Sequence, residues 1–313
     1  MLKILFKLIL FLSLFFLFGI FVASSVESHR DAKKWDYIYN LDNNIDILFM
    51  GSSHIFTALD PNIIDPILNM NSFNLGSNGQ MIIQTYFNLV EVLKYRVPKI
   101  ILIDINCFQR SKTAPTHGYI YQNLSGMKLS SNKINSFYNT INSDEYLDAI
   151  TLFIKEKYNW KRFKKIKNLF EKDKKTKRSK GFVGKKQKIT EQDFSNALLD
   201  RLESSKKYPF NNENIDYLNK IINLCKKHNI KIILFRTPTL RKVDLGIELN
   251  NYLTNYAIDN EIKFYNFAFF FKEINLSYLD YYDTTHLSKA GSHKVSTYLS
   301  NLLLTDFSNL LKN

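Results

Sequence analysis

A serine near the start of the chain stands in a position suited to nucleophilic chemistry. The sequence Gly-Ser-Ser-His over residues 51–54 directly follows a short apolar run, Ile45–Met50. A serine at a tight turn between a strand and a helix exposes its hydroxyl, and its backbone N–H near the helix N-terminus can help to stabilise an oxyanion. Ser53 is therefore a candidate nucleophile. His54 beside it is either a substrate contact or a surface residue at the start of the helix.

A base and a carboxylate stand close together near the other end of the chain. Asp283 and His286 are three residues apart in the sequence Asp-Thr-Thr-His, just before a predicted closing helix. Nucleophilic serine catalysis needs a base to take the hydroxyl proton and a carboxylate to hold the imidazole in the right tautomer. The residue types and their spacing predict a triad of Ser53, His286 and Asp283.

A glycine-containing segment, Asn-Leu-Gly-Ser-Asn-Gly-Gln over residues 74–80, follows a second short apolar run. Glycines in such a loop allow positive φ angles and a close approach of the backbone to a ligand. The alternative is an ordinary turn at the start of a helix. Gln80, at the end of this segment, is a weak candidate for a substrate contact.

The elements that must position these residues alternate between strand and helix. Five short apolar runs predict strands over Ile45–Met50, Ser72–Leu75, Lys99–Ile105, Ile230–Phe235 and Ile262–Phe267. Helical spacing of apolar residues predicts helices over Met81–Tyr95, Tyr217–Lys227, Ile247–Ile258 and Val295–Leu304. This alternation predicts an α/β fold with a mostly parallel sheet. In such sheets the active site lies beyond the carboxyl ends of the strands, where the three motifs fall.

Together the motifs resemble those of the SGNH (GDSL-like) hydrolase superfamily. Gly51, Ser52 and Ser53 match its first block, with Ser52 in place of the usual acid, and Asp283 with His286 matches its last block. The resemblance covers about residues 46–303, apart from the middle of the chain. It implies a flavodoxin-like three-layer α/β/α domain with strand order 2-1-3-4-5.

The resemblance also implies an oxyanion hole. Its donors would be the backbone N–H groups of Ser53 and Gly79, with the side chain of Asn106 as a third. The Asn106 assignment departs from the family pattern, because the glycine that usually precedes the family's asparagine is missing. The alternative is an asparagine that closes the strand end.

Within the superfamily, the motifs resemble a membrane-anchored branch that assists O-acetylation of polysaccharides and D-alanylation of teichoic acid. This implies a serine esterase or O-acyltransferase acting on acyl groups, acetyl above all, of cell-surface or exported glycans. An acylated glycan or small acyl ester, the membrane and a membrane-bound O-acyltransferase complex are the expected partners. A catalytically silent scaffold subunit of a glycan acylation or export complex, and a membrane-associated lysophospholipase or thioesterase, are the alternatives.

The N-terminus predicts a membrane signal over residues 1–25. Lys3 and Lys7 precede an uncharged and almost wholly apolar run, Leu8–Ala23. Its length lies between a bilayer-spanning segment and the apolar part of a cleavable signal, so both fates are open, and we favour an uncleaved anchor. The lysines place the N-terminal end in the cytoplasm and the remainder of the chain outside.

Residues 26–44 read as a polar linker, and residues 45–106 and 211–313 as the catalytic domain. Residues 107–210 interrupt the alternation and predict a helical insertion, a candidate cap over the site. This insertion holds a basic block, Lys155–Lys188, with 16 Lys or Arg residues and three acidic residues. Such a block either contacts an anionic polymer or lipid head groups, or forms a solvated helical segment.

Composition limits the class of protein. The chain has 313 residues and a net charge of +14, and its hydrophobic fraction of 45% excludes wholesale disorder. Cys107 and Cys225 are the only cysteines, and we expect two buried thiols without a disulfide. No metal, organic cofactor or nucleic-acid partner is expected.

Overall fold

Five parallel strands form one sheet in the computed structural model, which describes residues 2–25, 30–40, 44–109, 112, 117–157, 179–202, 212–240 and 247–311. The strands are β1 Ile47–Met50, β2 Ser72–Asn74, β3 Ile100–Asp104, β4 Lys231–Arg236 and β5 Lys263–Asn266. Their order is β2-β1-β3-β4-β5 and every pair is parallel. The predicted order 2-1-3-4-5 is confirmed, and all carboxyl ends meet at one edge of the sheet.

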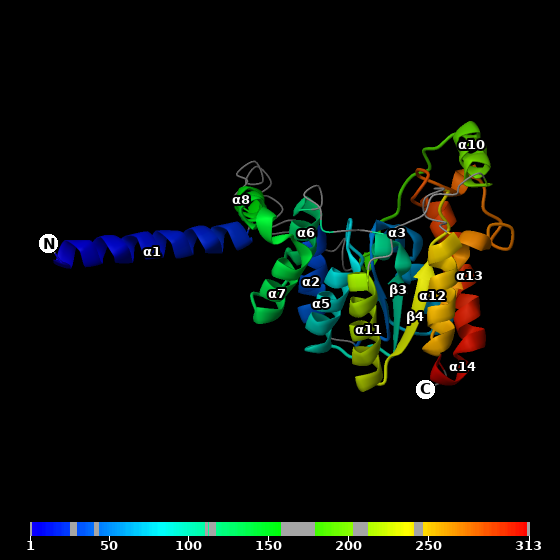
Figure 1. The fold of residues 1–313 in the computed structure, drawn as a ribbon, viewed down its shortest axis with the longest axis horizontal. Helices are drawn as coiled ribbons and strands as arrows, with labels where there is room; N and C mark the ends of the chain where they lie inside the picture. The colour runs from blue at the N-terminus through cyan, green and yellow to red at the C-terminus, as the bar shows by residue number, and fades with distance from the viewer. Residues whose placement is uncertain are drawn as a thin grey trace.

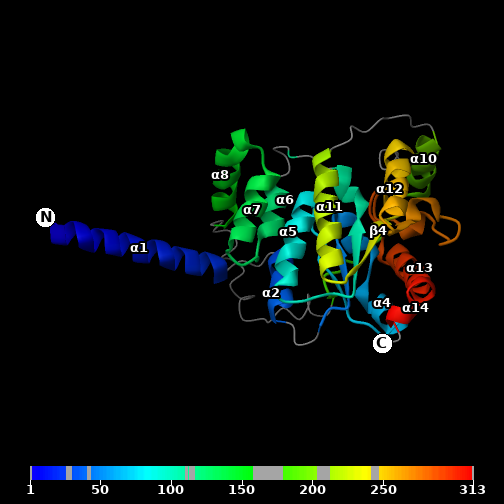
Figure 2. The ribbon, with the colours of Figure 1, turned by 60° about the horizontal axis from the view of Figure 1, so that its bottom comes forward.

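Helices cover both faces of this sheet. Successive strand residues point to opposite faces, so Leu48 and Met50 enter one core while Ile47 and Phe49 enter the other. The first core is covered by α5 Ile82–Leu93, α11 Asn212–Lys227 and α12 Ile247–Asp259, and the second by α3 Ser53–Ala58, α4 Pro61–Leu68 and α13 Lys289–Asp306. Figures 1 and 2 show α5 and α11 on one side of the sheet and α13 on the other. The predicted three-layer α/β/α arrangement is confirmed.

Short elements complete the carboxyl edge of the sheet and the C-terminus. These are the 3₁₀ helices η1 Ile105–Gln109, η6 Phe267–Phe269 and η7 Tyr278–Asp280, and the last helix α14 Ser308–Leu311. The closing helix α13 begins six residues earlier than its apolar spacing predicts. Ser288 accounts for the early start, because its hydroxyl accepts a hydrogen bond from the Gly291 N–H and caps the helix.

The segment interpreted as a linker over residues 26–44 contains a packed helix, α2 Arg30–Asn40. Trp35 and Ile38 of α2 are buried in the first core, and Asp31 and Lys34 are buried as well. The linker interpretation is therefore wrong for residues 30–40. The polar composition of this segment did not indicate a packed helix. Four of the seven residues from Asp31 to Tyr37 are charged, and only two large apolar side chains of α2 are fully buried.

The first helix, α1 Leu2–Ser25, extends away from the body of the molecule (Figure 1). Large apolar side chains between Ile4 and Leu14 are exposed along it. Within the described residues, no helix meets the combination of length and apolarity needed to cross a membrane. The anchor expected over residues 1–25 stays a prediction.

The insertion contains four described α-helices: α6 His117–Leu124, α7 Ser131–Thr140, α8 Tyr146–Lys157 and α10 Glu191–Leu202, with a 3₁₀ turn η3 at Ser143–Glu145. Here α6 packs against α2 and α7 packs against α5. These contacts join the first part of the insertion to the helical layer that covers the first core. Its predicted role as a cap stays a prediction.

The insertion returns to the body of the molecule at the end of β2. The Asn74 N–H donates to the carbonyl of Lys180 at 2.9 Å, and the Val183 N–H donates to the carbonyl of Phe56 at 2.9 Å. Gly181 has a φ of +85°, and a Cβ there would lie 1.9 Å from the Asn74 carbonyl oxygen, so only glycine fits. Of the basic block Lys155–Lys188, residues 158–178 lie outside the described part of the chain.

Candidate active site

Ser53 is the first residue of α3, directly beyond the carboxyl end of β1. The turn that precedes it begins at Gly51, whose φ of +140° is unusual for a residue with a side chain. Ser52 caps the helix, because its hydroxyl oxygen accepts a hydrogen bond from the His54 N–H at 3.4 Å. The turn therefore places the Ser53 hydroxyl at the sheet edge, where the other motifs arrive.

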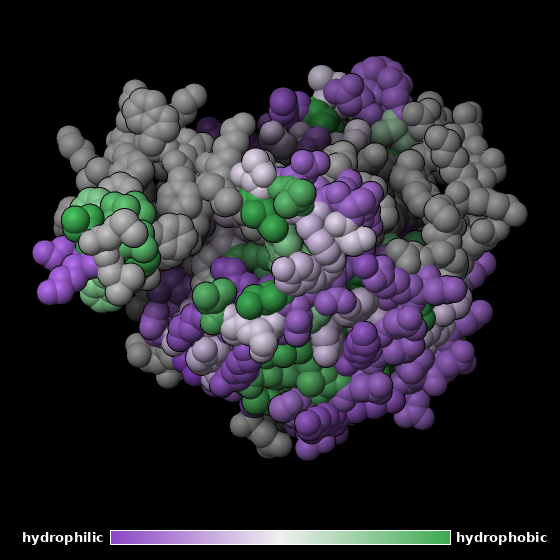
Figure 3. Space-filling model, turned by 60° about the vertical axis from the view of Figure 1, so that its left-hand side comes forward, coloured by the Kyte–Doolittle hydropathy of each residue, from purple (hydrophilic) through white to green (hydrophobic). Residues whose placement is uncertain are grey.

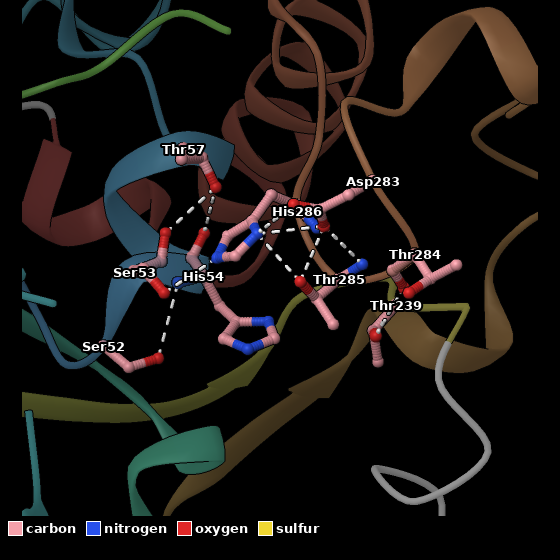
Figure 4. A network of polar contacts seen from close by, with 9 residues as sticks. All are labelled: Ser52, Ser53, His54, Thr57, Thr239, Asp283, Thr284, Thr285 and His286. Carbon is pink, nitrogen blue, oxygen red and sulfur yellow. Dashed lines mark hydrogen bonds and ion pairs between the residues drawn. The ribbon is translucent and has the colours of Figure 1, made fainter. Parts of the chain in front are cut away.

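The structure brings Ser53, His286 and Asp283 together (Figure 4). Ser53 Oγ lies 2.8 Å from His286 Nε2, and His286 Nδ1 lies 2.9 Å from Asp283 Oδ2 and 3.0 Å from Oδ1. With the carboxylate beside Nδ1, that nitrogen carries the ring proton and Nε2 is free to accept the serine proton. The three side chains have the contacts that nucleophilic serine chemistry needs.

The carboxylate of Asp283 is held in its ionised form. Burial raises its pKa, but the hydrogen bonds from His286 and Thr285 and the positive field of the imidazole outweigh burial, so the pKa lies well below its ordinary value. The hydroxyl of Thr285 donates to Asp283 Oδ1 at 2.7 Å and lies 2.8 Å from His286 Nδ1. Thr285 therefore contacts both Asp283 and His286.

The loop that carries Asp283 and His286 is braced by the segment after β4. The Leu240 N–H donates to the Thr284 carbonyl at 2.9 Å, and the Thr239 hydroxyl donates to the same oxygen at 3.3 Å. Within the loop, the Tyr282 N–H donates to the His286 carbonyl at 2.9 Å. These bonds fix the backbone on both sides of the imidazole.

Gly79 lies in a turn of the 74–80 loop, which is tied to the serine turn. The Ser77 N–H donates to the Gly51 carbonyl at 2.9 Å, and the Gln80 N–H donates to the Ser77 carbonyl at 3.3 Å. Gly79 has a φ of +59°, and a Cβ there would lie 2.5 Å from a ring carbon of Tyr119 in α6. The glycine is required by its backbone conformation and by the aromatic ring packed against it.

The backbone N–H groups of Ser53 and Gly79 make no hydrogen bond within the part of the chain that the structure describes. Both groups belong to turns at the carboxyl edge of the sheet, and the Ser77–Gly51 hydrogen bond connects these turns. Two unengaged N–H groups of this kind are the usual donors of an oxyanion hole. The assignment of Ser53 and Gly79 as these donors stays a prediction.

A buried ion pair from α2 supports the 74–80 loop. Lys34 Nζ donates to the Gly76 carbonyl and lies 3.8 Å from Asp31 Oδ1. The Ser77 hydroxyl donates to Asp31 Oδ2 at 3.0 Å. The side chains of Lys34 and Asp31 are only 1% and 3% exposed, so water contributes little to holding these charges. Residues 76 and 77 are thus fixed by the segment that was interpreted as a linker.

Gln80 does not face the site. It is fully buried, its Nε2 donates to the Thr85 hydroxyl at 2.8 Å, and its Oε1 accepts from Asn123 Nδ2 at 3.0 Å. The prediction of a substrate contact at Gln80 is therefore wrong. The side-chain amide joins the loop to α5 and α6, which sequence spacing alone did not indicate.

Asn106 is also placed differently from the expectation. Its Nδ2 donates to Asp104 Oδ1 at 2.8 Å and to the Thr237 hydroxyl at 3.2 Å. Both amide hydrogens therefore have acceptors inside the protein, and the structure does not offer this side chain as the third oxyanion donor. Asp104, which the sequence did not single out, accepts hydrogen bonds from the backbone N–H and the side-chain amide of Asn106.

His54 lies beside the imidazole of His286. Its ring centre is 5.2 Å from that of His286, with an angle of 34° between the ring planes. Figure 4 shows the His54 ring next to the His286 ring. The substrate contact expected of His54 stays a prediction.

No family model matches the chain, and no curated protein matches it. Among solved structures, the chain is similar to that of a presumed acylhydrolase from Bacteroides fragilis. The two share 14% identity with a TM-score of 0.41, over 91% of this chain and 98% of that chain. At this distance the likeness says nothing of what the chain acts on.

Three groups at the site were missed in the sequence: Asp104, Thr285 and the Asp31–Lys34 pair. Of these, Thr285 was the easiest to predict from the sequence, because it stands next to His286 and its hydroxyl can reach the carboxylate of Asp283.

Within the described residues, no group of three or more His, Cys, Asp or Glu side chains is placed to hold a metal ion. Cys107 and Cys225 are buried and form no disulfide, as predicted.

Proposed function

We propose that this protein is a serine hydrolase or acyltransferase that acts on acyl esters through Ser53, His286 and Asp283. The observation that carries the proposal is the contact of 2.8 Å between Ser53 Oγ and His286 Nε2, with Asp283 on the other ring nitrogen. A hydroxyl, an imidazole and an ionised carboxylate in this order form a nucleophile, a general base and its orienting group.

In the first half of the reaction, Ser53 Oγ attacks the ester carbonyl carbon while its proton moves to His286 Nε2. The carbonyl oxygen becomes an oxyanion, and the backbone N–H groups of Ser53 and Gly79 are the proposed donors that stabilise it. The C–O bond to the alcohol then breaks, and the alcohol oxygen takes the proton from His286 Nε2. Asp283 favours the transient imidazolium because its carboxylate contacts Nδ1.

In the second half, a water molecule or a sugar hydroxyl attacks the acyl-serine. His286 Nε2 takes the proton of the attacking oxygen, and the proton passes to Ser53 Oγ when the acyl–serine bond breaks. Water gives a free acid and the reaction is that of an esterase. A sugar hydroxyl gives a new ester, and the reaction is an acyl transfer.

The substrate class and location belong to the same proposal. The motif resemblance favours acyl groups on cell-surface or exported glycans, with the catalytic body outside the cytoplasm. The exposed apolar side chains of α1, clear of the body of the molecule, favour attachment to a membrane. Figure 3 shows the face from which α1 projects, where apolar side chains in green lie among hydrophilic ones.

A silent scaffold is the weaker alternative. A scaffold has no need of an aligned hydroxyl, imidazole and carboxylate, whereas here the hydroxyl and the carboxylate each lie within hydrogen-bond distance of the imidazole.

Acyl-chain preference tests the substrate class. If the substrate is an acetylated glycan, we expect the protein to hydrolyse 4-nitrophenyl acetate faster than 4-nitrophenyl esters of long acyl chains. Preference for long chains would point to a lysophospholipase or thioesterase.

The deciding experiment compares wild type with Ser53→Ala. The wild-type protein is expected to hydrolyse 4-nitrophenyl acetate and to be labelled by a fluorescent organophosphonate, and Ser53→Ala to lose both. Ser195→Ala is the matched control, because it removes an exposed serine hydroxyl of α10 and leaves the nucleophile and its turn in place. Turnover or labelling that persists in Ser53→Ala would refute the role of Ser53.

A further inference from the structure

A buried carboxylate from β3 lies directly beneath the nucleophile turn. Asp104 is the last residue of β3 and is fully buried. Its Oδ2 accepts a hydrogen bond from the Ser52 hydroxyl at 2.7 Å and from the Ser52 N–H at 3.3 Å. Position 52 itself carries no acid, so the negative charge at this turn comes from the neighbouring strand.

The second oxygen of the same carboxylate engages Asn106. Asp104 Oδ1 accepts from Asn106 Nδ2 at 2.8 Å and from the Asn106 N–H at 3.1 Å. The carboxylate thus has four donors and, within the described residues, no ion-pair partner. Hydrogen bonds to an ionised group are stronger than neutral ones, so these contacts hold both neighbours firmly.

Steric packing adds to these hydrogen bonds. A Cβ at Gly51 would lie 2.5 Å from the Asp104 Cβ, so the glycine backbone rests against this side chain. Gly51 and Ser52 are therefore fixed against Asp104 by contact and by hydrogen bonding. The next residue along the chain is Ser53, whose N–H and hydroxyl take their directions from this turn.

We infer that Asp104 is a positioning residue that orients the nucleophile turn through Ser52 and withdraws the Asn106 amide from the oxyanion. This rests on the proposed serine chemistry and deepens it in two ways. The acid that the motif lacks at position 52 is supplied across the sheet from position 104. The oxyanion hole depends on the two backbone donors, at Ser53 and Gly79.

The test begins with Asp104→Asn, which keeps the shape of the side chain and turns one acceptor into a donor. We expect kcat for 4-nitrophenyl acetate to fall about tenfold or more with little change in KM, because the donors of Ser52 or of Asn106 lose an acceptor. The rate of organophosphonate labelling is expected to fall in parallel. Wild-type kcat and labelling rate in this variant would overturn the inference.

Asp46→Asn is the matched control. Asp46 is a partly buried carboxylate that accepts from the Asn71 N–H at 2.9 Å, at the opposite, amino end of the strands. Its loss is expected to lower the urea midpoint while leaving kcat unchanged. A change of kcat in Asp104→Asn that is matched by Asp46→Asn would reduce Asp104 to a merely structural role and overturn the inference.

A swap of the two residues separates position from charge. Asp104→Ser is expected to be slow, and Ser52→Asp slower than wild type because two carboxylates would face one another. The double variant Ser52→Asp/Asp104→Ser restores one carboxylate and one hydroxyl to the pair, and is expected to recover part of kcat. A double variant no faster than Asp104→Ser alone contradicts the inference.

Asn106→Ala tests whether the Asn106 amide contributes to the oxyanion hole. Loss of an oxyanion-hole donor lowers kcat by roughly 10²–10³-fold, whereas Asn106→Ala is expected to lower it less than about tenfold. A loss of a hundredfold would show that Asn106 donates to the oxyanion and would overturn this part. If Asp104→Asn does not fold, Ser52→Ala removes the 2.7 Å contact to Asp104 together with the 3.4 Å cap to the His54 N–H, and unchanged kcat there would also overturn the proposal.

These outcomes are distinct from failure of the proposed function. A wild-type protein that neither hydrolyses the ester nor reacts with the phosphonate contradicts the serine chemistry itself. A reactive wild type with an equally reactive Asp104→Asn contradicts only the role of Asp104.

Discussion

Ser53 Oγ and His286 Nε2 lie 2.8 Å apart although 233 residues separate them in the chain. The packing of α3 and α4 against α13 brings them together. The Ser296 hydroxyl of α13 donates to the Ala58 carbonyl at 3.2 Å, and the Asp60 N–H donates to Ser296 at 2.9 Å. Ser53 begins α3 and His286 lies in the loop just before α13, so the contacts between these helices bring the two side chains together.

Replacement of Asp283 by asparagine should reduce kcat by roughly 10²–10⁴-fold, because the imidazole loses the group that fixes its tautomer. KM is expected to change little, since the carboxylate does not face the ester. Steady-state kinetics with 4-nitrophenyl acetate measures both constants. Activity within threefold of wild type would exclude Asp283 from the catalytic machinery.

The lowered pKa of Asp283 sets a pH dependence for stability. Its ordinary pKa is about 3.9, and the folded value lies below that. The ionised carboxylate therefore stabilises the fold fully above pH about 4, and this contribution is lost as the pH falls through the folded pKa. The difference in urea unfolding free energy between wild type and Asp283→Asn should be present at pH 5 and shrink as the pH falls below about 4. A difference that already disappears at pH 6 would contradict the assignment.

Thr285→Val keeps the side-chain shape and removes the hydroxyl that contacts Asp283 and His286. One hydrogen bond is worth about 0.5–1.5 kcal/mol, which corresponds to a loss of roughly 2–13-fold in kcat. Thr285→Ser should retain activity close to wild type because it keeps the hydroxyl. Equal rates for the valine and serine variants would show that the hydroxyl has no part in orienting the pair.

Gly79→Ala should impair the oxyanion loop for two reasons, the positive φ and the overlap with Tyr119. We expect a drop in kcat of tenfold or more, of the order found when an oxyanion donor is displaced. Combining it with Tyr119→Ala removes the overlap but leaves the backbone strain, so the double variant should recover only part of the loss. Wild-type kinetics for Gly79→Ala would exclude Gly79 as a donor.

Lys34→Met removes the buried ammonium that lies 3.8 Å from Asp31 and donates to the Gly76 carbonyl, and removal of one partner of a buried ion pair typically destabilises a protein by about 3–5 kcal/mol. The double variant Lys34→Met/Asp31→Asn leaves neither charge of this pair and should be more stable than the single variant. Urea unfolding measures both. Kinetics on the folded fraction should show a lower kcat in both, since the Gly76 carbonyl loses its donor. A single variant as stable as wild type would contradict the burial of this pair.

The sheet was predictable because each strand is a short apolar run between turn residues, and the order followed from the motif resemblance. The closeness of Ser53, Asp283 and His286 followed from the same arrangement, because parallel strands end at one edge. What could not be predicted was the pairing of buried polar groups. Ser52 and Asp104 meet only because β1 and β3 are neighbours, and nothing in either segment indicates the partner.

The same limit explains why the predictions for Asn106, Gln80 and α2 were wrong. The first two are polar residues beside a catalytic motif, which in sequence looks the same whether the side chain faces substrate or another buried amide. In α2, burial of Lys34 and Asp31 runs against the usual exposure of charged residues. Whether such a residue is buried can be determined only when the residues that bind it are known from the fold.

The place of α2 in the chain bears on how the N-terminus can be processed. A signal peptidase that cut beside Ala23, Ser24 and Ser25 would release the first helix and leave Arg30–Asn40 whole. The rest of the chain would then keep Ser53, His286 and Asp283 together whether or not the first helix stays attached. A proteolytic cut a few residues later, beyond Lys34, would remove the ammonium that binds the Gly76 carbonyl and is expected to loosen the loop that holds Gly79.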